Sequence, residues 1–220
     1  MAFEDYTTHP FTKFDKDWAL LTAGTMNDFN SMTISWGGMG TMWSAPVAFL
    51  VVKPSRYTSD FLRRHDEITL SWYPRSERKA LGIFGTQSGR DTDKVKETGF
   101  TPVEIEGAVT YREAEEPLVC RKLFMQQLDT DLVPQEIRNT FYLPGTKEGF
   151  MHQLVIARVL SIHTKYAPGP VRRFHARRRR DVSRPPPALF STHSMAQRND
   201  TFSSRNSDAI DLEPLQDILS

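Results

Sequence analysis

The stretch that most constrains the fold is residues 30–58, NSMTISWGGMGTMWSAPVAFLVVKPSRYT. It holds two apolar strands joined by a loop rich in glycine, tryptophan and methionine. The second strand, residues 46–53, is β-branched and aromatic almost throughout, which is typical of a strand buried on both faces. A proline ends this strand and leads directly into Ser55-Arg56-Tyr57-Thr58 and a helix predicted over residues 55–65.

The turn after this strand is suited to hold a phosphate. A helix that begins at Ser55 or Thr58 presents unpaired backbone N–H groups and the positive end of its dipole, and both favour an anion. Arg56 adds a planar fork of donors that matches phosphate oxygens two at a time. The alternative is that Ser55 or Thr58 only caps the helix while Arg56 is solvated.

A second turn with similar chemistry lies in residues 85–94, GTQSGRDTDK. Ser88 and Gly89 precede a helix predicted to begin near Asp91, and Arg90 and Lys94 supply positive charge. This pattern also favours an anion, and a polar loop that caps its helix through Asp91 explains it equally.

The remaining pattern predicts a mainly β fold. Strands are expected at residues 18–25, 29–36, 46–53, 67–73, 117–128 and 151–163, with a hairpin at 102–112. Short helices are expected at 55–65, at 76–84 with Gly85 at its C′ position, and near Asp91, while residues 129–149 are turn-rich. Sequential, hairpin-linked strands indicate an antiparallel, Greek-key-like β-barrel with short helices.

Three separated motifs, in order along the chain, resemble the flavin reductase-like family, the FMN-binding split barrels that include flavoredoxins. They are NSMTISWG, PVAFLVVKPSRYTSDFL and ALGIFGTQSGRDTDKVKETGFTP, and the resemblance covers residues 10–162. It implies an FMN cofactor whose isoalloxazine edge lies along Asn30, Ser31, Met32 and Thr33. It implies phosphate contacts from Arg56, Tyr57, Thr58, Ser88, Gly89 and Lys94. From the residues alone, Met32 fits a core position and Asn30 a turn.

The resemblance also implies a function and an assembly. The expected protein is a homodimeric, FMN-dependent oxidoreductase that passes electrons from NAD(P)H through the flavin to an acceptor. Because the flavin supplies the redox chemistry, no catalytic acid or base is nominated. Two alternatives stay open: a flavoredoxin-type electron-transfer protein without NAD(P)H activity, and a binding protein that acts through a basic tail.

One strand departs from the family pattern. His152 opens the last strand, where the family often has a histidine near the flavin, but the family's later Gly-Glu is Ala157-Arg158 here. This change weakens the expectation of a nicotinamide site, and His152 fits a structural role as well as a flavin contact.

Charge divides the chain near its last strand. From His163 onward there are ten Lys/Arg and six Asp/Glu, so the formal charge of +1 hides a body of −3 and a tail of +4. Residues 1–166 are the predicted FMN-binding domain, and residues 167–220 are predicted to be disordered. The tail's run of arginines at 177–180 attracts nucleic acid or membranes in one interpretation, and is a non-selected extension from a shifted reading frame in the other.

The remaining residue types exclude several classes of protein. Cys120 is the only cysteine, so no internal disulfide forms, and its alternation with Leu118 predicts a buried thiol. The six histidines show no metal-ligand spacing. The longest apolar run, residues 47–52, is far shorter than the roughly 20 residues of a membrane span, and the N-terminus lacks signal-peptide features. A cytoplasmic protein is expected.

Overall fold

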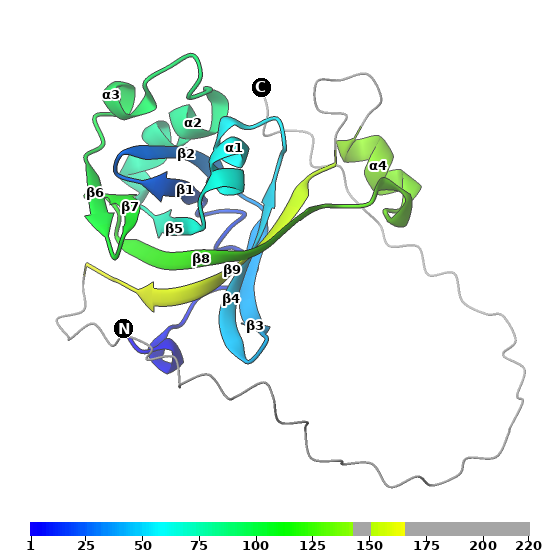
Figure 1. Ribbon diagram of the computed structural model, residues 1–220, viewed down its shortest axis with the longest axis horizontal. Helices are drawn as coiled ribbons and strands as arrows, with labels where there is room; N and C mark the ends of the chain where they lie inside the picture. The colour runs from blue at the N-terminus through cyan, green and yellow to red at the C-terminus, as the bar shows by residue number, and fades with distance from the viewer. Residues whose placement is uncertain (143–150, 166–220) are drawn as a thin grey trace, which may run out of the picture. The chain divides into compact units, whose positions relative to one another are not determined.

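The computed structural model describes residues 1–142 and 151–165 (Figure 1). The predicted disorder of the tail and its binding to nucleic acid or membranes lie outside the described residues. Within them, no helix is long and apolar enough to cross a membrane.

Seven strands form one antiparallel sheet in the order β2-β1-β5-β8-β9-β4-β3 (Figure 1). Their bounds are β1 Ala19–Thr25, β2 Asp28–Ile34, β3 Gly37–Met42, β4 Ala45–Val52, β5 Glu67–Trp72, β8 Glu116–Gln127 and β9 Gln153–Ile162. β2 and β3 follow each other in sequence but lie at opposite edges of the sheet, so no ladder joins them in the described chain. The predicted mainly β, antiparallel fold is confirmed.

The sheet curls around one core to which most of its strands contribute. Leu21, Leu50, Leu70, Leu118 and Val155 come from five different strands and are completely buried in it. Burying each of these side chains stabilises the fold by about 2 kcal/mol. Alternation along the strands places these residues on one face. In β4, buried and half-buried residues largely alternate, so the prediction that this strand is buried on both faces is not met.

A second, smaller core covers the other face of β1. Leu20, Tyr73, Phe84, Phe100 and Tyr111 meet there. Leu20 comes from β1, Phe84 from helix α2 (Arg78–Thr86), and Tyr111 from a separate hairpin of β6 (Pro102–Ile105) and β7 (Ala108–Tyr111). Tyr73 directly follows β5, and Phe100 lies just before β6. This core fixes α2 and the hairpin against the sheet.

The helices are short. Besides α2, they are α1 Tyr57–Arg64, α3 Lys94–Thr98 and α4 Gln135–Phe141, with 3-10 turns η1 Phe3–Asp5, η2 Arg75–Glu77 and η3 Thr130–Leu132. Both α1 and α2 contact β2. The start of α1 and the loop after α2 are therefore held near the same edge strand.

The sequence predicted a glycine-rich loop between the two strands of residues 30–58. This prediction is wrong, because the segment forms strand β3. It pairs with β4 from Gly37 opposite Leu50 to Met42 opposite Ala45. A Cβ at Gly37 would lie 2.7 Å from the carbonyl oxygen of Phe49, so glycine permits this close pairing. The turn is only Trp43-Ser44, with positive φ values of 52° and 54° that suit a tight hairpin.

Several predicted helix ends are also corrected. Arg56, not Ser55 or Thr58, is the N-cap residue of α1, because its backbone stays extended, with φ −70° and ψ 136°. α3 begins at Lys94 rather than near Asp91, because the Asp93 carboxylate accepts a hydrogen bond from the N–H of Lys96.

Two further differences concern the ends of helices and turns. Gly85 lies inside α2, where the backbone continues to Thr86, and Gln87 is the C-cap residue. The turn-rich interpretation of residues 129–149 missed α4, a helix too short to give a clear periodic signal.

Cys120 is buried as predicted, and burial raises the pKa of its thiol to about 12.

Candidate functional site

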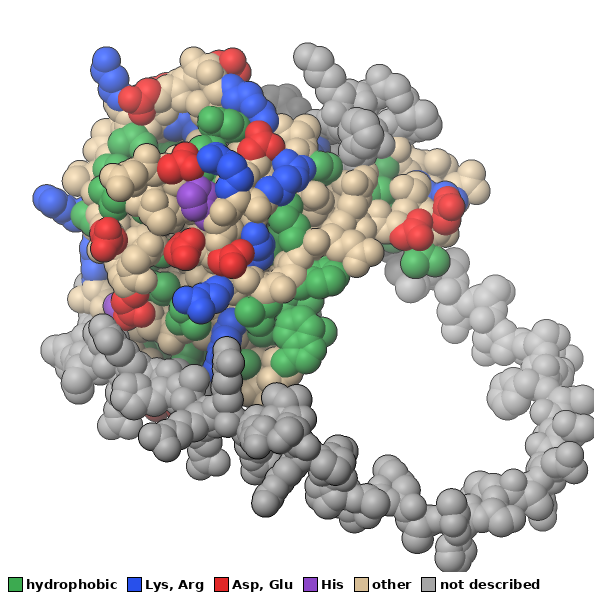
Figure 2. Space-filling model, in the orientation of Figure 1, with side chains coloured by type: hydrophobic (Ala, Val, Ile, Leu, Met, Phe, Trp, Pro, Cys, Tyr) green, Lys and Arg blue, Asp and Glu red, His purple; other side chains and the backbone are tan. Residues whose placement is uncertain are grey.

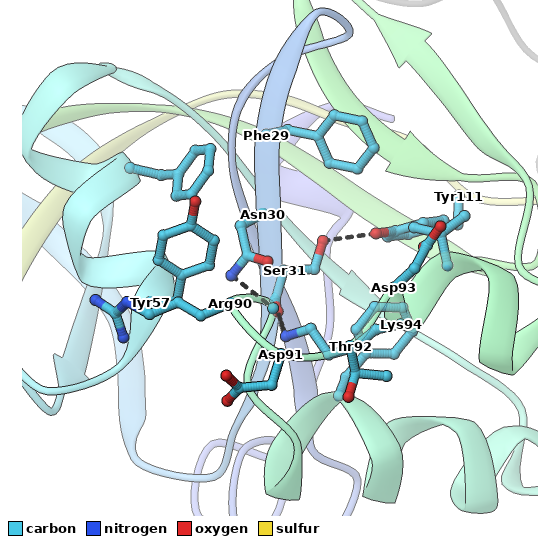
Figure 3. A pocket seen from close by; sticks show the side chains of 14 residues that line it. Phe29, Asn30, Ser31, Tyr57, Arg90, Asp91, Thr92, Asp93, Lys94 and Tyr111 are labelled. Carbon is cyan, nitrogen blue, oxygen red and sulfur yellow. Dashed lines mark hydrogen bonds between the residues drawn. The ribbon is translucent and has the colours of Figure 1, made fainter.

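A hollow of about 480 Å³ lies between β2, the start of α1, the loop before α3 and the first turn of α3 (Figure 3). Its size falls within the range of small-molecule sites in proteins. Its lining residues are Phe29, Asn30, Ser31, Tyr57, Phe61, Phe84, Gly89, Arg90, Asp91, Thr92, Asp93, Lys94, Val95 and Tyr111.

The structure brings together half of the predicted site residues at this hollow. Asn30, Ser31, Tyr57, Gly89 and Lys94 line it. They come from all three sets of residues that the family resemblance implied, so segments far apart in the sequence meet at this hollow.

The other five predicted residues do not line the hollow. Met32 is 8% exposed and belongs to the main core, as its alternative interpretation stated. Thr33 lies half-buried beside α2 and donates a hydrogen bond of 2.6 Å to the carbonyl oxygen of Leu81. Thr58 is completely buried, and the Ser88 hydroxyl accepts a hydrogen bond from the N–H of Arg90. Arg56 is half-buried at the N-cap of α1.

Lys94 is the most unusual charged group of the site. Its side chain is buried, and its ammonium donates a hydrogen bond to the carbonyl oxygen of Ser31 (Figure 3). Burial, and secondarily the positive charge of Arg56, lower the pKa of Lys94 to about 8. Among the described residues neither Lys94 nor Arg56 forms an ion pair. Two neighbouring cations without a carboxylate partner favour an anion between them.

Carboxylates are present at the rim of the hollow but are exposed. Asp91 is solvent-exposed, and Asp93 is exposed and caps α3 through its side chain. Because these groups face water, they repel an anion less than the buried Lys94 attracts one.

Arg90 holds the loop before α3 against α1 by hydrogen bonds and a ring contact. Its guanidinium donates to Asp60 Oδ2 at 2.5 Å and to the carbonyl oxygen of Ser55 at 3.3 Å, and it lies 4.6 Å from the centroid of the Tyr57 ring. Gly89 sits so close to β2 that a Cβ would lie 2.3 Å from Asn30 Oδ1. The loop is therefore seated tightly on both neighbouring elements.

A chain of hydroxyl groups lies behind the hollow. The Ser31 hydroxyl is 2.7 Å from that of Tyr111 (Figure 3). It is also 2.8 Å from the hydroxyl of Thr22. Burial raises the pKa of Tyr111, so this phenol stays neutral and positions Ser31 by hydrogen bonding. Sequence reasoning missed Tyr111, because it reaches the site from the separate β6–β7 hairpin and carries no local motif.

His152 lies in a different cluster, at the start of β9. It is buried, its Nδ1 is 2.7 Å from the hydroxyl of Tyr142, and its ring centroid is 4.9 Å from that of Trp36. Ala157 and Arg158 pair with Ala48 and Val47 of β4. None of these residues lines the hollow beside Lys94.

The curled antiparallel sheet with its few short helices defines the class of this fold, a split barrel. The chain belongs to the flavin reductase like domain family, whose match covers residues 11–183. The family resemblance predicted from the three sequence motifs is thereby confirmed. No curated protein matches the chain significantly.

Solved structures of other proteins share the fold of this chain. A flavoredoxin from Methanosarcina acetivorans is 16% identical, with a TM-score of 0.52 over 76% of this chain and 75% of that chain. Flavoredoxin of Desulfovibrio vulgaris (Miyazaki F) is also 16% identical, with a TM-score of 0.53 over 76% of each chain. An FMN-binding protein from Thermus thermophilus is 16% identical, with a TM-score of 0.52 over 72% of this chain and 78% of that chain. The predicted split-barrel fold is confirmed.

Proposed function

We propose that this protein binds FMN, with the phosphate group held between Arg56 and Lys94. The observation that carries the proposal is that two partly or fully buried cations lie near each other and have no carboxylate partner in the described part of the chain. A phosphate monoester carries a charge of about −1.5 to −2 at neutral pH, which matches two cations. Gly89 lets the loop before α3 lie directly against Asn30 and Tyr57 of the hollow, and membership of the family supports a flavin as the ligand.

The edge strand β2 offers the polar backbone that a flavin ring requires. It pairs with β1 on one side only, so the outer N–H and C=O groups of residues 30–33 have no ladder partner in the described chain. These groups match the donors and acceptors of the pyrimidine edge of isoalloxazine. Bound FMN supplies hydride and electron-transfer chemistry, while the protein orients it and excludes water.

The reaction we infer is the transfer of electrons from NAD(P)H through FMN to an acceptor. Family membership supports this oxidoreductase role. The test is to load the purified protein with FMN under anaerobic conditions and follow flavin absorbance. Bleaching by NADH or NADPH without an added partner is the expected result, and absence of FMN binding would overturn the proposal.

A second candidate is an electron-transfer flavoprotein that accepts electrons only from a protein donor. It is favoured by the replacement of the family's Gly-Glu with Ala157-Arg158, in a segment where Ala157 is completely buried. Flavin that is bleached by dithionite but not by either nicotinamide cofactor would establish this alternative.

We also propose that the protein forms a homodimer through an apolar surface next to β3. Trp36, Ile137 and Phe141 are 40%, 40% and 48% exposed, and the rings of Trp36 and Phe141 lie 5.4 Å apart. Figure 2 shows a further group of hydrophobic side chains over the lower part of β3 and β4, while charges of both signs are interspersed over the rest of this face. Exposed apolar clusters of this kind mark association sites.

The dimer is tested by sedimentation equilibrium of the full chain. Phe141→Ser is expected to shift the protein toward monomer, because it removes an exposed ring from the cluster. Phe11→Ser is the matched control, since Phe11 is 91% exposed and lies outside the cluster. A monomeric wild-type protein at micromolar concentration would refute the proposal.

A further inference from the structure

A second hollow, of about 730 Å³, lies on the other side of α2 and shares no lining residue with the first. It is formed by the segment before β1, the end of β5 and the start of α2. Its lining residues are Lys13, Lys16, Asp17, Tyr73, Pro74, Arg75, Arg78, Leu81 and Glu115. The proposed FMN site makes no use of these side chains.

Four cations and two carboxylates line this second hollow, so its lining carries an excess of positive charge. Lys13 is paired with Glu116 at 2.9 Å and lies 4.6 Å from the centroid of the Trp72 ring. Lys16 is paired with Asp15 at 2.8 Å, but both side chains are more than half exposed, and such pairs are weak in water. The charge of Lys16 is therefore available to a ligand.

Arg75 and Arg78 are the side chains of this hollow that are best suited to bind an anion. The Arg78 guanidinium is stacked 3.6 Å from the centroid of the Trp18 ring, and one of its nitrogens donates to the carbonyl oxygen of Asp17 at 3.2 Å. A stacked guanidinium keeps its remaining edge N–H groups for a further acceptor. Arg75 is exposed at the start of η2, and its side chain has no partner among the described residues.

We propose that this second hollow binds the phosphate group of a small organic phosphate, at a site independent of the FMN phosphate. Two guanidinium forks match phosphate oxygens in pairs, and Lys16 adds a third charge. The volume also accommodates a nucleotide-sized molecule.

The position of the hollow makes a nucleotide a suitable source of this phosphate. Leu81 lines the hollow, while its carbonyl oxygen accepts the hydrogen bond from Thr33 on the edge strand β2. The site is thus separated from the β2 edge by a single residue of α2. A phosphate-bearing molecule bound here leaves Lys94 in place, because Lys94 lines only the first hollow.

Isothermal titration calorimetry of the full chain, with and without saturating FMN, tests the proposal. The probes are pyrophosphate, 5′-AMP and adenosine 2′,5′-bisphosphate, which separate free phosphate from the two kinds of nucleotide end. At least one probe is expected to bind, with an affinity that decreases as salt rises. Arg75→Gln is expected to weaken this binding about tenfold, because it removes one bidentate contact.

Two matched variants make the outcome decisive. Arg112→Gln removes an exposed arginine elsewhere, and Lys94→Gln removes the buried cation of the first hollow. Arg112→Gln is expected to leave binding of the strongest probe unchanged. Lys94→Gln is expected to remove only the part of that binding that saturating FMN also removes. The proposal is overturned if no probe binds to the FMN-saturated protein, or if Arg75→Gln binds as wild type does. A complete loss of probe binding in Lys94→Gln also overturns it, because the probes would then occupy only the first hollow.

Discussion

The Asn30 side-chain amide donates a hydrogen bond of 2.7 Å to the hydroxyl of Thr58, across 28 positions of sequence. Both residues are buried, one on the edge strand β2 and the other in the first turn of α1. Asn30 Oδ1 also lies against Gly89 in the loop before α3. This one amide therefore joins the three segments to which the sequence assigned the flavin edge and the two sets of phosphate contacts.

Gly89→Ala is expected to weaken FMN binding and destabilise the fold by about 1–2 kcal/mol, the cost of losing a buried hydrogen bond. A Cβ at position 89 would lie 2.3 Å from Asn30 Oδ1, so the Asn30 amide must rotate away from Thr58. FMN titration and thermal unfolding measure both effects. Gly82→Ala is the control, because a Cβ there meets no atom within 4 Å. Equal behaviour of the two variants would contradict the prediction.

Arg56→Ala is expected to weaken FMN binding by about 2–3 kcal/mol, the range for a charge-assisted contact with phosphate. Its affinity for riboflavin, which has no phosphate, should stay unchanged. Fluorescence titration of both flavins separates the phosphate contact from a general loss of structure. Unchanged FMN affinity would mean that the phosphate binds elsewhere.

FMN affinity is expected to fall as pH rises through about 8, the lowered pKa of Lys94. Below this pH the ammonium is charged and attracts phosphate, and above it the neutral amine does not. The lowered pKa also means that the unfolded chain holds more protons between pH 8 and the ordinary value of 10.5, so this group's contribution to the free energy of unfolding rises with pH in that window. Titrations from pH 6.5 to 9.5 check the affinity, and Lys94→Gln should abolish the transition.

Arg90→Ala is expected to speed FMN dissociation, because it removes the contacts that hold the loop before α3 against α1. The ion pair with Asp60 is partly exposed, so its coupling energy in a double-mutant cycle with Asp60→Asn should be only about 0.5–1 kcal/mol. Stopped-flow displacement of FMN measures the rate. A dissociation rate equal to that of the wild type would show that these contacts do not retain the ligand.

A chain that ends at residue 166 is expected to bind FMN with unchanged affinity. The last described strand, β9, is complete before this point, and the N–H of Lys165 bonds to the carbonyl oxygen of Glu115. Any salt-sensitive binding to nucleic acid should disappear with the tail, since the first 162 residues carry a balance of −3. Loss of FMN binding on truncation would place part of the flavin site beyond the proposed domain boundary.

The local pattern of this sequence predicted most strands well. Alternation in β1 and β2, and the apolar run of β4, depend on neighbouring residues, so their ends were placed within a residue or two. β3 was missed because its glycines have low strand propensity, and only pairing with β4 makes this segment a strand. The predicted starts of α1 and α3 were also displaced. Arg56 is the N-cap residue of α1, and Asp93 is the N-cap residue of α3.

By itself, the sequence determined the mainly β class, the buried face of each strand and the family, because hydrophobic alternation and ordered motifs are local properties. The family resemblance also nominated Asn30, Tyr57, Gly89 and Lys94 as FMN contacts, through motifs far apart in the chain, and these four residues line one hollow. Only the tertiary structure decided that Arg56 and Lys94 lie close enough to shift a pKa, that Tyr111 supports Ser31, and that Met32 is core. Burial and charge proximity arise when distant segments pack, and no spacing within one segment specifies them.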